Sequence, residues 1–285
     1  MAKRVFHQVD VFPSVSLSYL GNALAVVIID DVDGSIPTET LQKFACWTNL
    51  AETTYLFRPT DPQADYHVRI FTTTRELLFA GHPTLGTCSV CLQYNKPKNG
   101  NIVFQQCGVG LVKIKVSEEN PRLVSFAAPK LIKEGPVDSL TTSKLASILS
   151  IDPSEILESQ WVDNGPGWVA VLLEDAAKVK SIKAPTNTDG LSIGVIGFYQ
   201  VDNKYKYEVR AFIQEGARAV EDPVCGSLNA SIAQWLLKSG KVTAPYEAHQ
   251  GTCVARDGTI YISSDSDHVW VGGMVDQNIV GSVFL

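Results

Sequence analysis

The sequence has few cysteines, no run of basic residues and no long apolar stretch. Its formal charge is −6, from 24 Lys and Arg against 30 Asp and Glu, so the charge gives no reason to expect nucleic acid and argues mildly against a membrane surface. The longest uninterrupted apolar run, Ala23 to Ile29, is far shorter than a membrane span, and no secretory apolar region follows the first residues. We therefore expect a cytoplasmic protein with no nucleic-acid partner and no membrane partner.

The 6 cysteines show no spacing typical of a disulfide framework, so in a reducing compartment they are expected to be thiols. Cys88 and Cys91 form a CxxC, which could indicate zinc or redox chemistry. No second CxxC or His pair accompanies it, and the surrounding helix is predicted to start at His82-Pro83, so both thiols lie inside that helix rather than at its N-terminus. We interpret both cysteines as small buried apolar residues.

Several common catalytic motifs are also missing. No GxGxxG follows a predicted strand, no GxSxG is present, and Gly81-x4-Gly86-Thr87 lacks the lysine of a phosphate-binding loop. The five histidines show no metal-ligand spacing; they are His7, His67, His82, His249 and His268. We expect no metal and no organic cofactor.

What the sequence does contain is a repeat with a period of about half its 285 residues. Asn22-Ala23 before an apolar run recurs as Asn164-Gly165, Arg69-Ile70-Phe71 recurs as Arg210-Ala211-Phe212, and Gly81 at a predicted helix start recurs as Gly226. A period this long indicates two similar domains rather than a solenoid. With 45% hydrophobic and 19% charged residues, the chain can bury the necessary cores.

The hydrophobic pattern predicts more strands than helices. Helices are expected at Pro37 to Thr48, Pro83 to Tyr94, Ser139 to Leu149 and Leu228 to Lys238. Strands are expected at Val5 to Val11, Ala23 to Ile29, Thr53 to Phe57, Tyr66 to Thr72, Ile102 to Gln106, Val109 to Val116, Leu123 to Ala127, Val169 to Leu173, Ile193 to Val201, Tyr205 to Phe212, Thr252 to Arg256, Thr259 to Ser263, Val269 to Val271 and Ile279 to Leu285. The helices after Pro83 and from Leu228 have no continuous charged face and must be surrounded by protein.

These elements predict an α+β fold of two pseudo-symmetric lobes, each a curved mixed β-sheet wrapped around a central helix. The polar segment Ser117-Glu118-Glu119-Asn120-Pro121 is predicted to be the linker. The predicted N-terminal lobe is 1–117, with 275–285 returning to it, and the C-terminal lobe is 118–274.

Ionisable and small residues concentrate at three places in this scheme. Glu52 lies where a helix passes into a strand, Gly81-His82 opens the first buried helix, and Asp222 precedes Cys225-Gly226-Ser227 at the start of the second. A helix N-terminus offers unbonded backbone N–H groups and a positive dipole end, so two of them facing one cleft would hold a small carboxylate.

The strings NLAETTYLF, RIFTTTRELLFAGHPTLGT and EDPVCGSLNA, with FHQVDVF and YLGNALAVV, resemble the PhzF family of phenazine-biosynthesis-like isomerases along essentially the whole chain. The resemblance implies a diaminopimelate epimerase-like fold with the active site between the lobes. It also implies a homodimer and a cofactor-independent proton shift on a small carboxylate-bearing substrate. The family's usual Gly-Asn-Pro is Gly21-Asn22-Ala23 in this chain, and its usual proline before the Gly-His is Leu78.

Carried over by position, the resemblance assigns Glu52, His82 and Asp222 as catalytic residues. It assigns Gly81, Gly226 and Ser227 to substrate binding, with Cys225 as a further candidate. A proton shift between two carbons needs a group that takes and returns a proton, and desolvation in a closed cleft would bring a carboxylate's pKa toward the working pH.

Structural interpretations of the same residues stay open. Glu52 could be a carboxylate at a helix end on the surface, His82 a helix cap and Asp222 a turn residue before Pro223. A rival activity is a two-thiol amino-acid epimerase using Cys225, but its counterpart in the other half is Ala80. A second alternative is a non-catalytic relative that binds a metabolite or a protein.

Overall fold

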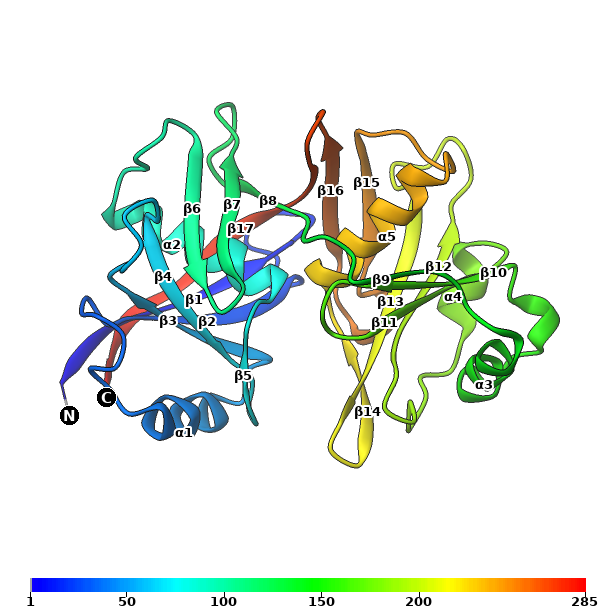
Figure 1. The fold of residues 1–285 in the computed structure, drawn as a ribbon, viewed down its shortest axis with the longest axis horizontal. Helices are drawn as coiled ribbons and strands as arrows, with labels where there is room; N and C mark the ends of the chain where they lie inside the picture. The colour runs from blue at the N-terminus through cyan, green and yellow to red at the C-terminus, as the bar shows by residue number, and fades with distance from the viewer. Residues whose placement is uncertain (1) are drawn as a thin grey trace. The chain divides into compact units, whose positions relative to one another are not determined.

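A computed structural model describes residues 2–285 of the chain, which form two compact units (Figure 1). One unit runs to Ala127 and includes Gly272–Leu285, and the other is Ala128–Val271. Both units combine a few helices with a mixed sheet whose strand pairs are mostly antiparallel, so the fold is of the α+β type predicted from the sequence.

The first unit is built on a sheet that begins and ends with the chain termini. Its elements are β1 (Lys3–Val11), β2 (Asn22–Ile28), α1 (Thr38–Thr48), β3 (Glu52–Phe57), β4 (Tyr66–Phe71), β5 (Glu76–Leu77), α2 (Gly81–Tyr94), β6 (Ile102–Cys107), β7 (Gly110–Val116) and β8 (Leu123–Ala127), with the part of β17 (Val269–Phe284) that follows Val271. Strand β1 lies antiparallel between β2 and β17. The backbone N–H of Leu285 donates to the carbonyl of Ala2 at 3.1 Å, which joins the two ends of the chain.

The second unit contains three α-helices, two short 3-10 helices and eight strands that lie wholly within it and that the structure describes. They are β9 (Lys133–Pro136), α3 (Ser139–Leu149), η1 (Pro153–Glu155), β10 (Glu158–Asp163), β11 (Trp168–Leu172), α4 (Ala176–Ser181), β12 (Ser192–Phe198), β13 (Tyr207–Glu215), β14 (Arg218–Asp222), α5 (Gly226–Lys238), β15 (Tyr246–Gln250), η2 (Thr252–Val254) and β16 (Gly258–Ser264).

The same succession of strand pairings occurs in both units. In the first, β1–β2 is antiparallel, β2–β3 parallel, β3–β4 and β4–β5 antiparallel, β4–β6 parallel and β6–β7 antiparallel. In the second, β10–β11, β11–β12, β12–β13, β13–β14, β13–β15 and β15–β16 repeat these directions in that order. Helix α2 follows β5 and precedes β6, and helix α5 follows β14 and precedes β15. The two helices therefore have the same place in the chain order of their units.

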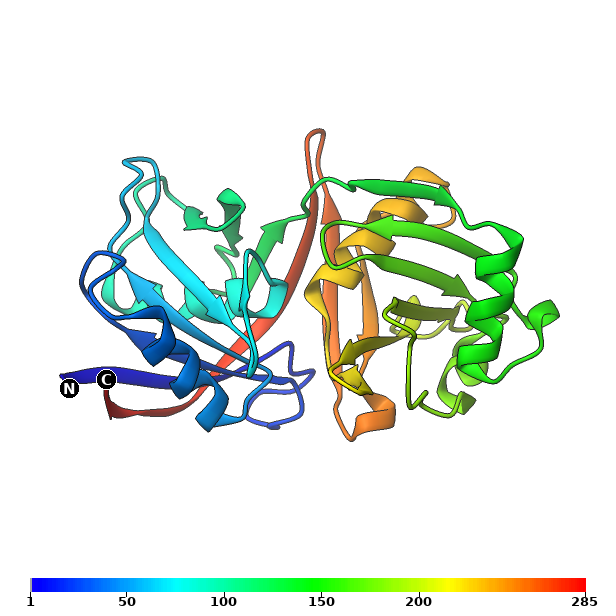
Figure 2. The same cartoon turned by 60° about the horizontal axis from the view of Figure 1, so that its bottom comes forward.

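Helices cover both faces of the central strands. In the first unit, Leu41 and Ala45 of α1 pack with Val27 and Ile29, while the alternate residue Leu24 meets α2 at Gly86. A Cβ added to Gly86 would lie 2.6 Å from Leu24 Cδ2, so glycine is needed for this close approach. Figures 1 and 2 show α1 on the outer side of its strands, whereas α2 lies among the strands of the unit.

The second unit is layered in the same way. Val169 and Val171 of β11, with Val195 of β12, face α3 and α4 in one core cluster. The other face of β12 carries Gly194, whose added Cβ would lie 2.5 Å from Leu228 Cδ1 of α5. Strands covered on both faces appear in the sequence as continuous apolar runs, which explains why the sequence predicts them as buried.

The predicted strand at Thr252 to Arg256 is wrong. These residues begin with the 3-10 helix η2, and the backbone is left-handed on either side of it, at Gly251 (φ 113°) and Ala255 (φ 55°). The strand of this region is β15, which ends at Gln250. The predicted helix at Ser139 to Leu149 is confirmed as α3 with the same bounds, and Asp138 caps it by accepting from the backbone N–H of Thr141 at 2.9 Å.

Candidate functional site

Glu52 is the first residue of β3 and is only partly accessible, with 15% of its side chain exposed. Helix α1 ends at Thr48, and the left-handed Asn49 (φ 56°) turns the chain toward β3. Because β3 runs parallel to β2, with Glu52 opposite Leu24, Glu52 lies at the same sheet edge as Asn22, where β2 begins. Glu52 is therefore not an exposed carboxylate at the end of a helix, which was the structural alternative for this residue.

His82 is the second residue of α2, and its side chain is buried, with 4% exposed. Its Nε2 lies 3.2 Å from Oε2 of Glu52, and its Nδ1 lies 3.4 Å from Nδ2 of Asn22. Burial lowers the pKa of His82 to about 3, so the imidazole is neutral near pH 7. The first unit therefore brings together a carboxylate, a neutral imidazole and a buried carboxamide.

Both buried helices begin without a side-chain cap. Ala80 precedes α2 and Cys225 precedes α5, and neither side chain bonds to a backbone N–H of the first turn. The first amides of a helix have no partner within the helix, so the starts at Gly81 and Gly226 present N–H groups and a positive dipole end. These groups can bind an anion such as a carboxylate.

In the second unit, the start of α5 is fixed by side chains from other elements. The Trp168 indole Nε1–H donates to Ser227 Oγ at 3.0 Å, and Asn164 Nδ2 donates to the Ser227 carbonyl at 3.0 Å. Ser227 Oγ also lies 3.5 Å from Cys225 Sγ. With its oxygen already accepting from an indole, the Ser227 hydroxyl can turn its hydrogen toward a ligand.

Gln250, the last residue of β15, ties the segment from Asp222 to α5 together. Its Oε1 accepts from the backbone N–H of Cys225 at 3.1 Å and from Asn229 Nδ2 at 2.8 Å. Its Nε2 donates to the carbonyl of Asp222 at 3.0 Å. Asp222 is the last residue of β14 and pairs with Ala211 of β13. The strand pairing and the bonds of Gln250 therefore fix the short segment that contains the predicted site residues of this unit.

Cys225 is buried, and burial, followed by the charge of Asp222, raises the pKa of its thiol well above the ordinary value. The thiol is therefore protonated at neutral pH, although it stands at a helix N-terminus. Cys88 and Cys91 are also buried, and burial raises the pKa of Cys91 to about 11. The interpretation of the CxxC as packing residues agrees with this environment.

Sequence reasoning missed Asn22, Trp168 and Gln250 as neighbours of the predicted site residues. In the sequence, Asn22 stands out only as part of Gly21-Asn22-Ala23 and through its repeat at Asn164-Gly165. The signal that could have found it is positional, because neighbouring parallel strands such as β2 and β3 begin at the same edge of a sheet. Among residues 2–285, no group of three or more His, Cys, Asp or Glu side chains is placed to hold a metal ion.

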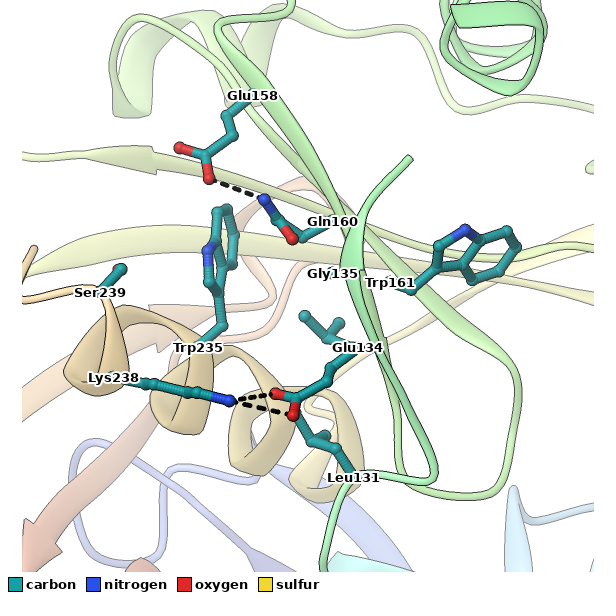
Figure 3. Close-up of a pocket in the computed structure, with 10 residues that line it drawn as sticks. Leu131, Glu134, Gly135, Glu158, Gln160, Trp161, Trp235, Lys238 and Ser239 are labelled. Atoms are coloured by element: carbon teal, nitrogen blue, oxygen red, sulfur yellow. Dashed lines mark hydrogen bonds and ion pairs between the residues drawn. The ribbon is translucent and has the colours of Figure 1, made fainter. Parts of the chain in front are cut away.

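A cavity of about 280 Å³ in the second unit is lined by none of these residues (Figure 3). Its lining comes from β9, β10 and the last turns of α5, and includes Trp235. The two carboxylates that line it are already paired: Glu134 accepts from Lys238 Nζ at 2.8 Å, and Glu158 lies 2.9 Å from Lys241 Nζ. The cavity contains none of the predicted site residues, and its charges neutralise one another.

None of the helices in the described part of the chain has the length and apolar character required to cross a membrane. The sequence profile of PhzC-PhzF, the phenazine biosynthesis-like proteins, matches residues 9–275. Antisense-enhancing sequence 1 of Schizosaccharomyces pombe is 31% identical over 309 aligned residues that cover 100% of both chains.

Two further similarities concern a named enzyme and a solved structure. The trans-2,3-dihydro-3-hydroxyanthranilate isomerase of Pseudomonas aeruginosa is 32% identical over 178 residues, which cover 61% of this chain and 59% of the isomerase. The crystal structure of the PhzF-family phenazine biosynthesis protein of Bacillus anthracis superposes with a TM-score of 0.81 over 100% of both chains. At 19% identity, that superposition shows a common fold.

Proposed function

Because this chain belongs to the PhzC-PhzF family of phenazine biosynthesis-like proteins and is an isomerase, we propose that it moves a proton on a small carboxylate-bearing substrate without a metal or organic cofactor. The observation that carries the proposal is the contact between Glu52 Oε2 and His82 Nε2 at 3.2 Å, in a largely buried setting. A carboxylate in such a setting, beside a neutral imidazole, suits a group that takes and returns a proton.

In the proposed reaction, a Glu52 carboxylate oxygen takes a proton from a substrate carbon. The electron pair of that C–H bond moves into the neighbouring unsaturated system, and the double bond shifts. The protonated Glu52, which is 15% exposed, exchanges its carboxyl proton with solvent and gives a proton to the carbon at the far end of that system, which restores the carboxylate and completes an isomer of the substrate. The neutral His82, whose Nε2 lies 3.2 Å from Glu52 Oε2, stays beside the carboxylate and is uncharged throughout.

Substrate binding is assigned to the starts of the two buried helices. The backbone N–H groups at Gly81, Gly226 and Ser227 would hold the substrate's carboxylate, and the Ser227 hydroxyl adds a donor whose oxygen is already engaged by Trp168. Asp222 would orient the polar groups of the substrate. By resemblance, we extend the proposal to two pseudo-symmetric lobes, a homodimer and a cytoplasmic location.

The difference between the units supports Glu52 rather than a two-base mechanism. In the second unit, the strand position that corresponds to Glu52 is Ser192, which opens β12 opposite Trp168 as Glu52 opens β3 opposite Leu24. At the helix starts, Cys225 corresponds to Ala80. A two-thiol epimerase needs two sulfurs, and this chain offers one, whose raised pKa keeps it protonated.

The proposal is tested with the purified chain after dialysis against a chelator, in D2O. Trans-2,3-dihydro-3-hydroxyanthranilate, the compound in the name of the Pseudomonas relative, is the first probe, followed by fractions of a metabolite extract. We expect NMR to show an isomer with carbon-bound deuterium, formed by wild type and by the surface variant Glu39→Gln but not by Glu52→Gln. Isomer formation that needs an added metal or cofactor, or that persists in Glu52→Gln, would refute it.

A further inference from the structure

Asn22 and His82 make a contact whose chemistry decides where the imidazole carries its proton. Asn22 is 2% exposed and His82 is 3% exposed, so water does not replace the groups that face the ring. One ring nitrogen, Nδ1, lies 3.4 Å from Asn22 Nδ2, and the other, Nε2, lies 3.2 Å from Glu52 Oε2. In a neutral imidazole one ring nitrogen carries the N–H and the other carries a lone pair. The group that faces each nitrogen therefore favours one of the two tautomers.

We propose that Asn22 is a positioning residue that holds His82 in the tautomer protonated at Nε2, by donating its carboxamide N–H to the lone pair of Nδ1. The inference rests on the proposed function, because the ring N–H is then on the nitrogen that lies 3.2 Å from the base Glu52. In the opposite tautomer, the lone pair of Nε2 would face a carboxylate oxygen, and two acceptors would meet in a buried place.

The backbone around Asn22 is held firmly enough for this role. Asn22 pairs with Val11 at the end of the β1–β2 ladder, and the preceding Gly21 donates its N–H to Asp10 Oδ2 at 3.1 Å. A Cβ at Gly21 would lie 2.3 Å from the carbonyl oxygen of Val11, so only glycine allows this close approach. Asn22 is therefore presented to α2 from a fixed strand end rather than from a mobile loop.

A tautomer can be observed without any substrate. The ring-nitrogen pattern of His82 in the ¹⁵N spectrum of the whole protein distinguishes protonation at Nε2 from protonation at Nδ1, and the His82→Gln variant identifies its signals. We expect wild type to show protonation at Nε2. Protonation at Nδ1 in wild type would overturn the inference.

The isosteric Asn22→Asp variant makes the test sharper, because a carboxylate at this position can only accept. We expect it to move the His82 proton to Nδ1 or to produce an imidazolium, and to lower kcat about 10- to 100-fold, the range for loss of a hydrogen bond to a charged group. Asn187→Asp is the matched control. Asn187 is exposed and accepts from the N–H of Asp189 at 2.8 Å, which aspartate can also do.

If Asn22→Asp keeps the wild-type tautomer, or if its kcat equals that of Asn187→Asp, the inference is wrong. If Asn22→Asp does not fold, the wild-type spectrum still decides the tautomer. The proposed function fails separately, through activity in Glu52→Gln, while the tautomer assignment would stand on the spectrum alone.

Discussion

The imidazole Nε2 of His82 lies 3.2 Å from Oε2 of Glu52, although 30 positions in the sequence separate the two residues. His82 is the second residue of a largely buried helix, and Glu52 opens a strand that is covered on both faces. The contact therefore depends on the packing of α2 against the β2–β3 edge, and burial keeps the imidazole neutral beside the carboxylate.

The lowered pKa of His82 predicts a loss of stability in acid. The pKa is about 3 in the folded chain against 6.5 for an ordinary histidine, so between these values the unfolded chain binds a proton that the folded chain does not. The free energy of unfolding should fall as pH falls below 6.5, by up to about 1.4 kcal/mol per pH unit from this group. Urea titrations of wild type and His82→Gln should show this dependence in their difference, and a flat difference would contradict it.

His249 predicts the opposite pH dependence of the free energy of unfolding, in a different pH range. Its Nδ1 lies 2.7 Å from Glu208 Oε2 and its Nε2 lies 2.7 Å from Asp257 Oδ1. Burial lowers the pKa of His249, but these two carboxylates outweigh burial and raise it overall. Its stabilising contribution should be complete below pH 6.5 and should be lost as pH rises through the raised pKa. The difference in unfolding free energy between wild type and His249→Gln should therefore shrink with rising pH, and growth of that difference above about pH 7 would be inconsistent with this assignment.

Arg69 and Arg210 provide a matched test of buried against exposed ion pairs. Each lies over the ring of the phenylalanine two residues later and pairs with a glutamate on the next strand, Glu76 or Glu221. The second pair is buried, with Arg210 3% exposed and Glu221 7% exposed, so Arg210→Met leaves a buried carboxylate unpaired.

We expect Arg210→Met to lower the free energy of unfolding by about 3–5 kcal/mol. Arg69→Met should cost about 1 kcal/mol, because Glu76 is 37% exposed and can be hydrated. Urea denaturation of both variants measures the contrast. Equal losses would show that burial does not set the strength of these pairs.

Cys225 should be dispensable for turnover. Its buried, protonated thiol is a packing group in our account, so Cys225→Ala should keep kcat within about threefold of wild type. Its stability should fall slightly because a sulfur atom is removed from the core. Loss of proton exchange in Cys225→Ala, with a folded protein and an active Glu52→Gln, would instead support the epimerase.

The sequence predicted those elements whose signal is local. The continuous apolar run at β2, the capped helix α3 and the two glycine helix starts all follow from periodicity, capping and backbone freedom. It did not predict the contacts of Asn22, Gln250 and His249, because each is made with residues that are far away in the chain. Thr252–Val254 form a 3-10 helix because Gly251 and Ala255 on either side of it are left-handed. The strand prediction was wrong here because it followed the β-branched residues between these two positions.

The catalytic roles of Glu52, His82 and Asp222 stay predictions. What the structure adds is a neutral His82 beside Glu52 and a second unit in which Ser192 stands at the corresponding strand position. These differences between otherwise similar units are what the proposed mechanism depends on.

The most direct test is the rate at which Glu52→Gln exchanges a carbon-bound substrate proton with D2O, compared with wild type and Glu39→Gln at equal protein concentration. The Glu52→Gln substitution keeps the size of the side chain but leaves an amide, which cannot take a proton. The account predicts a loss of about 10²- to 10⁴-fold, the contribution typical of a positioned acid or base, with wild-type exchange in Glu39→Gln. Exchange by Glu52→Gln at the wild-type rate would contradict it.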